Sequence, residues 1–514
     1  MILLDGASLT LDQIVAVAER GEEVGLSPQA AARVRAARDV VERQAHGDQP
    51  VYGVNTGFGS FAEVRIAPAD LERLQLNLLR SHAAGVGEPL AVRSVRATML
   101  LRANVLAKGF SGVRLDTLEF LVALLNRHIH PVVPCRGSVG ASGDLAPLAH
   151  LALVLIGEGE AWVGEPGAAE SGSPLAGAEA LRRTGLSPLL LAPKEGLALI
   201  NGTQPSTAVL ALALHDAWQV ARVADVAAAL SIDALRGSVH PFEARIHRER
   251  PFPGQVTSAA NIERLSTAEG GSAINRSHQG CGRVQDAYSM RCAAQVHGAT
   301  REALRFVGDI VATEANAATD NPMVFAADGE IVSGGNFHGA PVALAADVLA
   351  TALVPLATVS ERRTDRLLDP ALSGLPAFLT RDGGLQSGLM MAQVTAAAVA
   401  SEMKTLAHPA GIDTIPTSAN KEDHVSMSMT AALKAERAVA RAREVVAIEL
   451  LCACQAIDLL APLTTSPPLA RVHARVRSRV PTLDADRSPS SDIAAIVELI
   501  VTNLFEDVCG DLVK

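Results

Sequence analysis

The chain has 514 residues, of which 48% are hydrophobic and 19% are charged. This balance excludes an intrinsically disordered chain and predicts an extensive buried core. Lys and Arg number 45 against 55 Asp and Glu, which gives a formal net charge of −10 at pH 7. An acidic chain of this kind is a poor candidate for a dedicated binder of nucleic acid or of an anionic membrane.

Most of the predicted elements are helices. Aromatic residues make up only 3% of the chain, and a core rich in alanine and leucine favours close-packed helices over a β-sandwich. Thr10 and Gln13 have the spacing of a capping box, and Ser27 followed by Pro28 marks a second helix start. We expect helices over residues 11–20, 28–44, 70–80, 93–106 and 115–127, and a hairpin or surface excursion over 157–174.

After residue 200 the sequence becomes a series of long apolar segments, at 206–235, 341–368, 389–407 and 429–460. Helices of about 20 to 30 residues predict a long helical bundle. Only Glu449 interrupts the apolar residues between 445 and 454, so we expect this part to be buried on all sides. The fold is therefore predicted to be mainly α, with a long central helical bundle over 201–514 and a smaller N-terminal globular part over 1–200.

The apolar segments do not predict a membrane span. Residues 342–359 contain Asp347 and Pro355, which suits a buried helix better than a lipid-exposed one. No basic segment precedes an apolar one at the N-terminus, so we expect no secretory signal and a cytoplasmic location. The six cysteines show neither CxxC spacing nor a disulfide framework, and we expect reduced thiols at Cys135, Cys281, Cys292, Cys452, Cys454 and Cys509.

The densest local signal is the segment 137–150, which reads GSVGASGDLAPLAH. One interpretation is a flexible loop of small residues before a helix capped by Asp144. A phosphate-binding loop is a second interpretation, but the spacing is neither that of a P-loop nor that of a dinucleotide-binding turn. A third interpretation is chemical, because glycine has the least hindered amide nitrogen and can approach a neighbouring carbonyl group.

In this third interpretation the Gly143 nitrogen attacks the Ala141 carbonyl carbon and closes a five-membered ring. Loss of two waters, one of them from Ser142, leaves an exocyclic methylidene. The product is an electrophile made only from protein, and it resembles the 4-methylidene-imidazol-5-one (MIO) group.

The same loop resembles the prosthetic-group loop of the aromatic amino acid ammonia-lyase and aminomutase family. Further blocks of the family pattern follow in the expected order, namely YGVNTGFG with Tyr52, SHAAGVG with His82, NGTQ with Asn201, QDAYSMRC with Gln285, DNPMVF with Asp320, GGNFHG with Phe337 and TSANKEDHVSM with Glu422. The resemblance covers about residues 52–427. It implies a mainly α lyase whose MIO group forms from Ala141, Ser142 and Gly143, with no metal and no diffusible cofactor.

The chain contains two tyrosines, and both lie in these blocks. A phenol with a pKa of about 10 acts as a base near neutrality only where nearby positive charge or hydrogen bonds favour the phenolate. By resemblance, Tyr52 is the base that removes the β-proton of the substrate, and Tyr288 is a second active-site phenol.

The resemblance also implies a set of substrate-binding residues. The planar guanidinium of Arg291 suits a carboxylate, and by resemblance it binds the carboxylate of the substrate. Asn201 and Gln285 would form hydrogen bonds with the methylidene ring or the substrate. Phe337 would pack beside the ring and the substrate.

Three further positions bear on the choice of amino acid. Glu422 and Met390 resemble the histidine-acting members of the family, whereas members acting on tyrosine or phenylalanine, and the aminomutases, more often have Gln at position 422. A carboxylate can accept the N–H of an imidazole or take its proton. By resemblance, His82 lies at a position that recognises the side chain of the substrate, although tyrosine-selective members also carry His there. Lys421 departs from the usual Gln and places a charge beside Glu422, which could alter affinity or pH optimum.

The implied reaction converts L-histidine to trans-urocanate and ammonia, the first step of histidine degradation. The resemblance implies a homotetramer in which each active site is built from three chains, with no nucleic-acid or membrane partner. Two alternatives stay open: a tyrosine or phenylalanine lyase or aminomutase of the same family, and a non-enzymatic helical scaffold without the ring.

The other histidines do not predict a metal site. His128 and His130 stand two apart, which is a poor spacing for a metal pair unless both lie on a strand. His240 and His247 flank Glu243, and nothing else around them completes a ligand set.

Overall fold

The computed structural model describes residues 1–45, 47, 50–278, 281–282, 284–503, 505 and 512. The chain forms two compact units. The first contains residues 1–212, 308–347 and 409–433, and the second contains residues 213–307, 348–408 and 434–514. The functional division into 1–200 and 201–514 stays a prediction.

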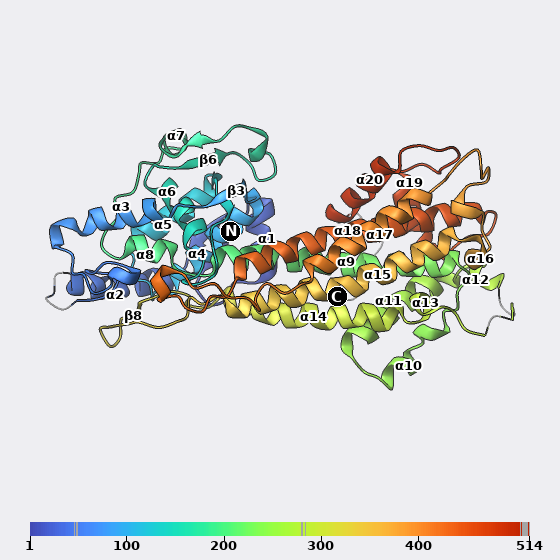
Figure 1. Cartoon of the computed structure of the whole chain (residues 1–514), viewed down its shortest axis with the longest axis horizontal. Helices are drawn as coiled ribbons and strands as arrows, with labels where there is room; N and C mark the ends of the chain where they lie inside the picture. Colours follow the sequence, from blue (N-terminus) through green and yellow to red (C-terminus); the bar gives the residue numbers. More distant parts are fainter. Residues whose placement is uncertain are drawn as a thin grey trace. The chain divides into compact units, whose positions relative to one another are not determined.

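The first unit contains the helices of the N-terminal part of the chain. They are α1 (Leu11–Arg20), α2 (Pro28–Ala45), α3 (Leu71–His82), α4 (Val92–Ala107), α5 (Leu115–Asn126), α6 (Leu145–Leu155), α7 (Gly177–Arg183) and α8 (Glu195–Ile200). Helix α6 packs against α3 and α8, and α4 packs against α1 and α5 (Figure 1). Because α3 ends at His82 and α8 ends just before Asn201, this packing brings two predicted site residues toward the loop that precedes α6.

The strands of the first unit are short and form four small sheets. They are β1 (Ile2–Leu4), β2 (Val24–Leu26), β3 (Val86–Pro89), β4 (Ile129–Pro131), β5 (Pro134–Arg136), β6 (Glu160–Val163), β7 (Leu175–Ala176), β8 (Met323–Phe325) and β9 (Glu330–Val332). Strands β1 and β2 pair in parallel, and the β3–β5, β4–β6–β7 and β8–β9 pairings are antiparallel. The antiparallel pairing of β6 with β7 confirms the hairpin expected over 157–174.

Four long helices contribute residues to both units, namely α9 (Gln204–Ala234), α14 (Ala293–Glu314), α15 (Ala340–Leu368) and α18 (Ser428–Leu459). The remaining helices of the second unit are α10 (Ala244–Arg248), α11 (Pro253–Thr267), α12 (Ala273–Arg276), α13 (Tyr288–Arg291), α16 (Pro370–Ser373), α17 (Met390–Leu406), α19 (Pro467–Arg477) and α20 (Pro489–Val501). The prediction of a mainly α chain with several helices of 20 to 30 residues is confirmed.

Local sequence signals account for where the predicted helices begin. Both hydrogen bonds of the capping box are present, because the Thr10 hydroxyl accepts from the Gln13 N–H and the Gln13 side chain accepts from the Thr10 N–H. Helix α2 begins at Pro28, as the Ser-Pro pair predicts, and the Ala30 N–H donates to the Ser27 hydroxyl.

The buried half of α18 is confirmed as apolar and enclosed on all sides. Residues 445–454 are all buried, including Glu449. The Glu449 carboxylate is compensated by Arg363 at 2.5 Å and by the hydroxyl groups of Ser231 and Ser360 at 2.7 and 2.6 Å. A carboxylate inside a helical core therefore has a cation and two further donors.

Among the described residues, one helix has the length and apolar composition that could cross a membrane. It is α15, and 56% of its apolar window is buried inside the structure. The five described cysteines are free thiols, and Cys509 lies outside the described residues.

Candidate active site

The loop over 137–144 is held against the residue that follows Asn201. Gly143 has a φ of +71° and forms an isolated parallel bridge with Gly202. A Cβ added at Gly143 would lie 2.1 Å from the Gly202 carbonyl oxygen. The Asp144 N–H donates to that same oxygen at 2.8 Å. The predicted ring residue Gly143 thus occupies a position where both the backbone angle and the space require glycine.

The Asp144 carboxylate anchors this loop from inside the protein. Its Oδ1 atom accepts from the Ser138 hydroxyl at 2.5 Å, and its Oδ2 atom accepts from the Ser206 N–H and hydroxyl at 2.9 and 2.7 Å. Burial raises the pKa of Asp144, while the bonds from Ser138 and Ser206 lower it. Asp144 is the residue before α6, but its side chain does not cap the helix as the first of the three interpretations requires, because it bonds to these two serines instead.

Two other segments meet the loop at Gly140. A Cβ at Gly140 would lie 2.1 Å from the Ser426 hydroxyl oxygen, and that hydroxyl donates to the Gly140 carbonyl at 2.9 Å. The Gly339 N–H donates to the same carbonyl at 3.4 Å. These contacts bring the segments that carry Phe337 and Glu422 to the loop, although they are distant from it in sequence.

Glu422 contacts the predicted ring directly. Its Oε1 atom accepts from the Ser142 hydroxyl at 3.3 Å, and its Oε2 atom accepts from the Thr417 hydroxyl at 2.5 Å. The structure therefore places the carboxylate proposed to recognise the substrate beside the serine proposed to become the methylidene.

The His82 imidazole has a defined tautomer. Its Nδ1 atom lies 2.9 Å from the Leu78 carbonyl oxygen, which can only accept, so Nδ1 carries the proton and Nε2 is an acceptor. Burial lowers the pKa of His82, opposed by the Leu78 carbonyl and by the charge of Glu422. His82 is therefore neutral at neutral pH, and it interacts electrostatically with Glu422.

The Tyr52 phenol lies in the same electrostatic field. Its oxygen accepts from the Gly59 N–H at 3.5 Å, and the Phe58 ring stands edge-on to it at 6.4 Å between centroids. Burial raises the pKa of Tyr52, the Gly59 N–H lowers it, and Glu422 raises it further. The phenol is thus protonated at neutral pH in the chain without substrate.

Asn201 is held by a buried ionic network. Its amide nitrogen donates to the Asn321 carbonyl at 2.8 Å and to Asp320 Oδ1 at 3.3 Å. Both partners accept, which orients the amide, and the side-chain oxygen of Asn201 is buried without a hydrogen-bond partner among the described residues. The Asp320 carboxylate lies 3.7 Å from Lys194 and 4.0 Å from Arg102, and all three side chains are buried.

Three further predicted residues gather in the second unit. The Arg291 guanidinium donates to the Gln285 side-chain oxygen at 3.0 Å and lies 4.6 Å from the centroid of the Tyr288 ring. Arg291 and Gln285 line a cavity of about 820 Å³. The Tyr288 side chain is 71% exposed in the single chain.

The last two predicted residues have less defined surroundings. Phe337 is half-buried in the turn that precedes Gly339, in the first unit. Met390 is half-buried and is the first residue of α17, in the second unit. Their roles stay predictions.

Sequence reasoning missed the residues that support this site. Thr417 and Asp320 stand in the TSANKEDHVSM and DNPMVF blocks, so the motifs contain them, but spacing gives no indication of their partners. Arg102 and Lys194 lie outside the quoted blocks. Both are buried, and nothing in the local sequence distinguishes them from the charged residues that are exposed.

The histidines outside the site have structural partners. His130 Nε2 lies 2.8 Å from the Gly164 carbonyl oxygen, and His240 Nδ1 lies 2.5 Å from the Glu243 carboxylate. Across the part of the chain that the structure describes, no group of three or more His, Cys, Asp or Glu side chains has the arrangement of a metal site.

Comparison with known proteins agrees with this arrangement. Residues 9–478 match the aromatic amino acid lyase family. A histidine ammonia-lyase of Anaeromyxobacter dehalogenans is 57% identical over 501 residues, which are 97% of this chain and 98% of that protein. The histidine ammonia-lyase structure from Trypanosoma cruzi has a TM-score of 0.91 and 44% identity, and the match covers 100% of this chain and 96% of that one.

A related structure is that of an enzyme with a different activity. The tyrosine aminomutase structure from Streptomyces globisporus has a TM-score of 0.92 and 36% identity, with 100% of this chain and 99% of that one covered. The fold is thus shared by members with different reactions, while the family match extends over most of the sequence. This chain belongs to the aromatic amino acid lyase family.

Proposed function

We propose that this chain is a histidine ammonia-lyase that converts L-histidine to trans-urocanate and ammonia. The observation that carries the proposal is the Glu422 carboxylate, which lies 3.3 Å from the Ser142 hydroxyl. An imidazole N–H gives this carboxylate a donor. A phenyl ring gives it none, and the desolvated group would cost about 1–3 kcal/mol. This contact therefore disfavours phenylalanine as the substrate. Tyrosine has a phenol O–H that could donate, and it is disfavoured instead by the residue at position 422, where tyrosine-acting members more often have Gln.

The residues present fit an MIO group formed from Ala141, Ser142 and Gly143. Gly143 has a positive φ and no room for a Cβ, which suits a glycine nitrogen that closes a ring. The buried, unpartnered side-chain oxygen of Asn201 lies one residue from Gly202, which bridges to Gly143. When formed, the group supplies an electrophilic carbon that turns the amino group of the substrate into a better leaving group.

The chain's own residues then perform the proton chemistry. Tyr52 removes the weakly acidic β-proton, and it must first lose its phenolic proton, because its pKa is raised by burial and by Glu422. Glu422 and His82 hold the imidazole of the substrate: the carboxylate accepts its N–H, and when the imidazole is protonated, Nε2 of the neutral His82 accepts the second N–H.

Arg291 binds the substrate carboxylate, with Gln285 and Tyr288 beside it. The guanidinium is already oriented by the Gln285 side chain and stacks on the Tyr288 ring. An active-site phenol that is 71% exposed in one chain needs another surface to exclude water from it. We therefore propose a cytoplasmic homotetramer in which each active site is built from three chains, without a metal or a diffusible cofactor.

The test is the ultraviolet absorbance of the purified protein with L-histidine, with L-tyrosine and L-phenylalanine in parallel. Rapid formation of urocanate with little product from the other two is the expected result. The variant Ser142→Ala is the matched control, because it keeps the chain but cannot form the methylidene. Cinnamate or coumarate instead of urocanate would overturn the substrate assignment, and no product from any of the three would favour the scaffold alternative.

A further inference from the structure

The short turn that carries Glu422 has an unusual backbone. Thr417 and Glu422 form an isolated antiparallel bridge, with N–H to carbonyl bonds of 3.0 and 3.4 Å in the two directions. Between them, Ser418, Ala419 and Asn420 have φ values of 50°, 53° and 64°. Three consecutive left-handed residues without a glycine are unfavourable for L-amino acids, so the surrounding contacts must maintain the turn.

The turn also packs against the loop of the predicted base. The 3₁₀ turn Ser418–Asn420 contacts the 3₁₀ turn Gly59–Phe61, and a Cβ added at Gly59 would lie 3.0 Å from the Ser418 hydroxyl oxygen. The Gly59 N–H is the group that donates to the Tyr52 phenol. The strained turn therefore links the position of Glu422 to the loop that contains Tyr52.

The two oxygens of the Glu422 carboxylate have different partners. Oε2 accepts from the Thr417 hydroxyl at 2.5 Å, across the bridge, and Oε1 accepts from the Ser142 hydroxyl at 3.3 Å. Ring formation removes the Ser142 hydroxyl as water, so Oε1 loses its donor while Oε2 keeps Thr417. Oε2 then keeps a protein donor that fixes the orientation of the carboxylate, and Oε1 is left without one and is open to a donor on the substrate.

We propose that Thr417 is a positioning residue that determines specificity for imidazole, acting through Glu422. Its hydroxyl fixes the carboxylate rotamer and directs a single oxygen, Oε1, at the imidazole N–H. Thr417 itself touches neither the ring nor the substrate. The inference rests on the proposed function, because it assigns to Thr417 the alignment of the group that recognises L-histidine.

The test compares Thr417→Val, which removes the hydroxyl at nearly constant shape, with Thr417→Ser, which restores it. Thr430→Val is the matched control, because Thr430 is exposed on α18 and lies outside the site. We expect kcat/KM for L-histidine to fall roughly 10- to 100-fold in Thr417→Val, the scale of a lost hydrogen bond to a charged group. The loss should appear mainly in KM, since the imidazole contact exists in the bound substrate as well as in the transition state.

Thr417→Ser is expected to stay close to the wild type, and a merely structural role for Thr417 would not give this rescue. The same substitution is then made in a Glu422→Gln background, where we expect Thr417→Val to cause little further loss. An equal loss in both backgrounds, or activity of Thr417→Val equal to that of Thr430→Val, would overturn the inference. If Thr417→Val does not fold, Thr417→Ala replaces it in the same cycle. Absence of urocanate from the wild type would instead reject the proposed function.

Discussion

At the scale of single residues, the site is organised around the negative charge of Glu422. The same carboxylate raises the pKa of the Tyr52 phenol and opposes the lowering of the His82 pKa by burial. The negative charge of this carboxylate favours binding of an imidazole cation or N–H. The same charge destabilises the negatively charged phenolate of Tyr52. Binding of the substrate as an imidazole cation would compensate this charge and make the phenolate easier to form.

The Tyr52 phenol can be titrated directly, because the chain contains only two tyrosines. In Tyr288→Phe, the phenolate absorbance band reports Tyr52 alone, and we expect it to appear above the ordinary pKa of about 10. Adding Glu422→Gln removes a negative charge beside the phenol, so the titration should move to lower pH. An unchanged titration in the double variant would show that Glu422 does not act on Tyr52.

A side chain at position 143 is expected to prevent formation of the ring. In Gly143→Ala the new Cβ meets the Gly202 carbonyl oxygen at 2.1 Å, and the φ of +71° is unfavourable, so ring closure should fail. Intact mass spectrometry measures this, because formation of the proposed ring would make the chain two waters lighter than its translated sequence. We expect Gly143→Ala and Ser142→Ala to keep the mass of their unprocessed sequences. A Gly143→Ala chain that is two waters lighter would show that the space around Gly143 does not control maturation.

At the scale of elements, buried polar groups hold the end of α8 beside the site. Helix α4 contributes Arg102, whose guanidinium donates to the Ala198 carbonyl at 2.5 Å and to the Asn201 carbonyl at 2.6 Å, at the end of α8. Burial lowers the pKa of Arg102 to about 10, opposed by Asp320. The segment before β8 contributes Asp320, which therefore compensates the charges of this helix end.

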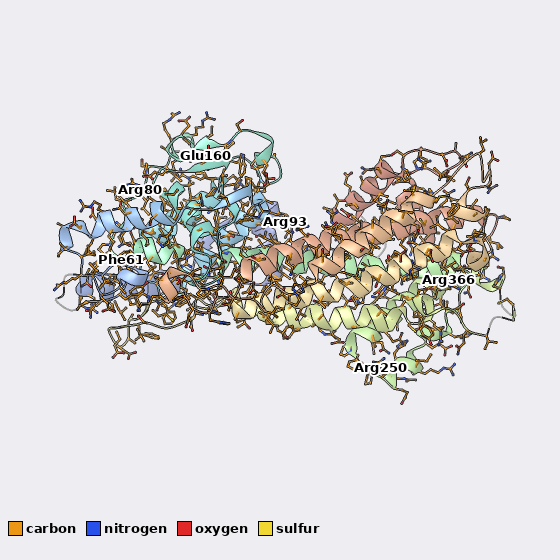
Figure 2. The ribbon with its side chains drawn as sticks, in the orientation of Figure 1. Phe61, Arg80, Arg93, Glu160, Arg250 and Arg366 are labelled. Carbon is orange, nitrogen blue, oxygen red and sulfur yellow. The ribbon has the colours of Figure 1, made fainter. Side chains whose placement is uncertain are left out.

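Removing the Asp320 charge should destabilise the chain strongly. Asp320→Asn leaves Arg102 and Lys194 buried without a counter-ion, which costs about 3–5 kcal/mol. We expect a large drop in the thermal unfolding midpoint. Arg80→Gln is the control, because Arg80 pairs with Glu158 at the surface of the first unit (Figure 2) and its loss should leave the midpoint nearly unchanged. Equal midpoints for the two variants would show that the buried network does not support the fold.

At the scale of the whole molecule, the predicted site residues fall into two groups. Tyr52, His82, Asn201 and Glu422 belong to the first unit, with the ring residues, while Gln285, Arg291 and Met390 belong to the second. We propose that different chains of the tetramer supply the two groups. In such an assembly the exposed Tyr288 would be covered by a neighbouring chain.

Complementation tests whether the site is shared. Tyr52→Phe and Arg291→Gln are each expected to be inactive, but their co-expression should restore part of the activity, since some mixed sites receive Tyr52 from one chain and Arg291 from another. Light scattering should give four times the chain mass of 53.4 kDa. Inactive mixed tetramers would mean that each chain supplies both groups to one site.

The sequence by itself predicted many of the helices, though not α11, α14, α19 or α20, and it indicated a chemistry for the loop. Capping signals and apolar periodicity are local, so the ends of α1 and α2 and the burial of residues 445–454 could be predicted from them. The succession Ala141, Ser142, Gly143 is likewise contiguous, so the residues that could form the ring can be read from the sequence, whereas the positive φ of Gly143 and its contact with Gly202 come from the fold. The parallel pairing of β1 with β2 escaped prediction, because strands of three residues carry too little periodicity.

Only the tertiary structure decided which side chains contact and position the predicted site residues. Thr417 is five residues from Glu422, yet its hydroxyl reaches the carboxylate only because three left-handed residues close the turn. Asp320 meets Lys194 and Asn201 over more than one hundred residues of sequence. Contacts of this kind form only when distant parts of the chain come together on folding. The identity of a residue gives the chemistry of its side chain, but it does not give the partner that the side chain contacts in the fold.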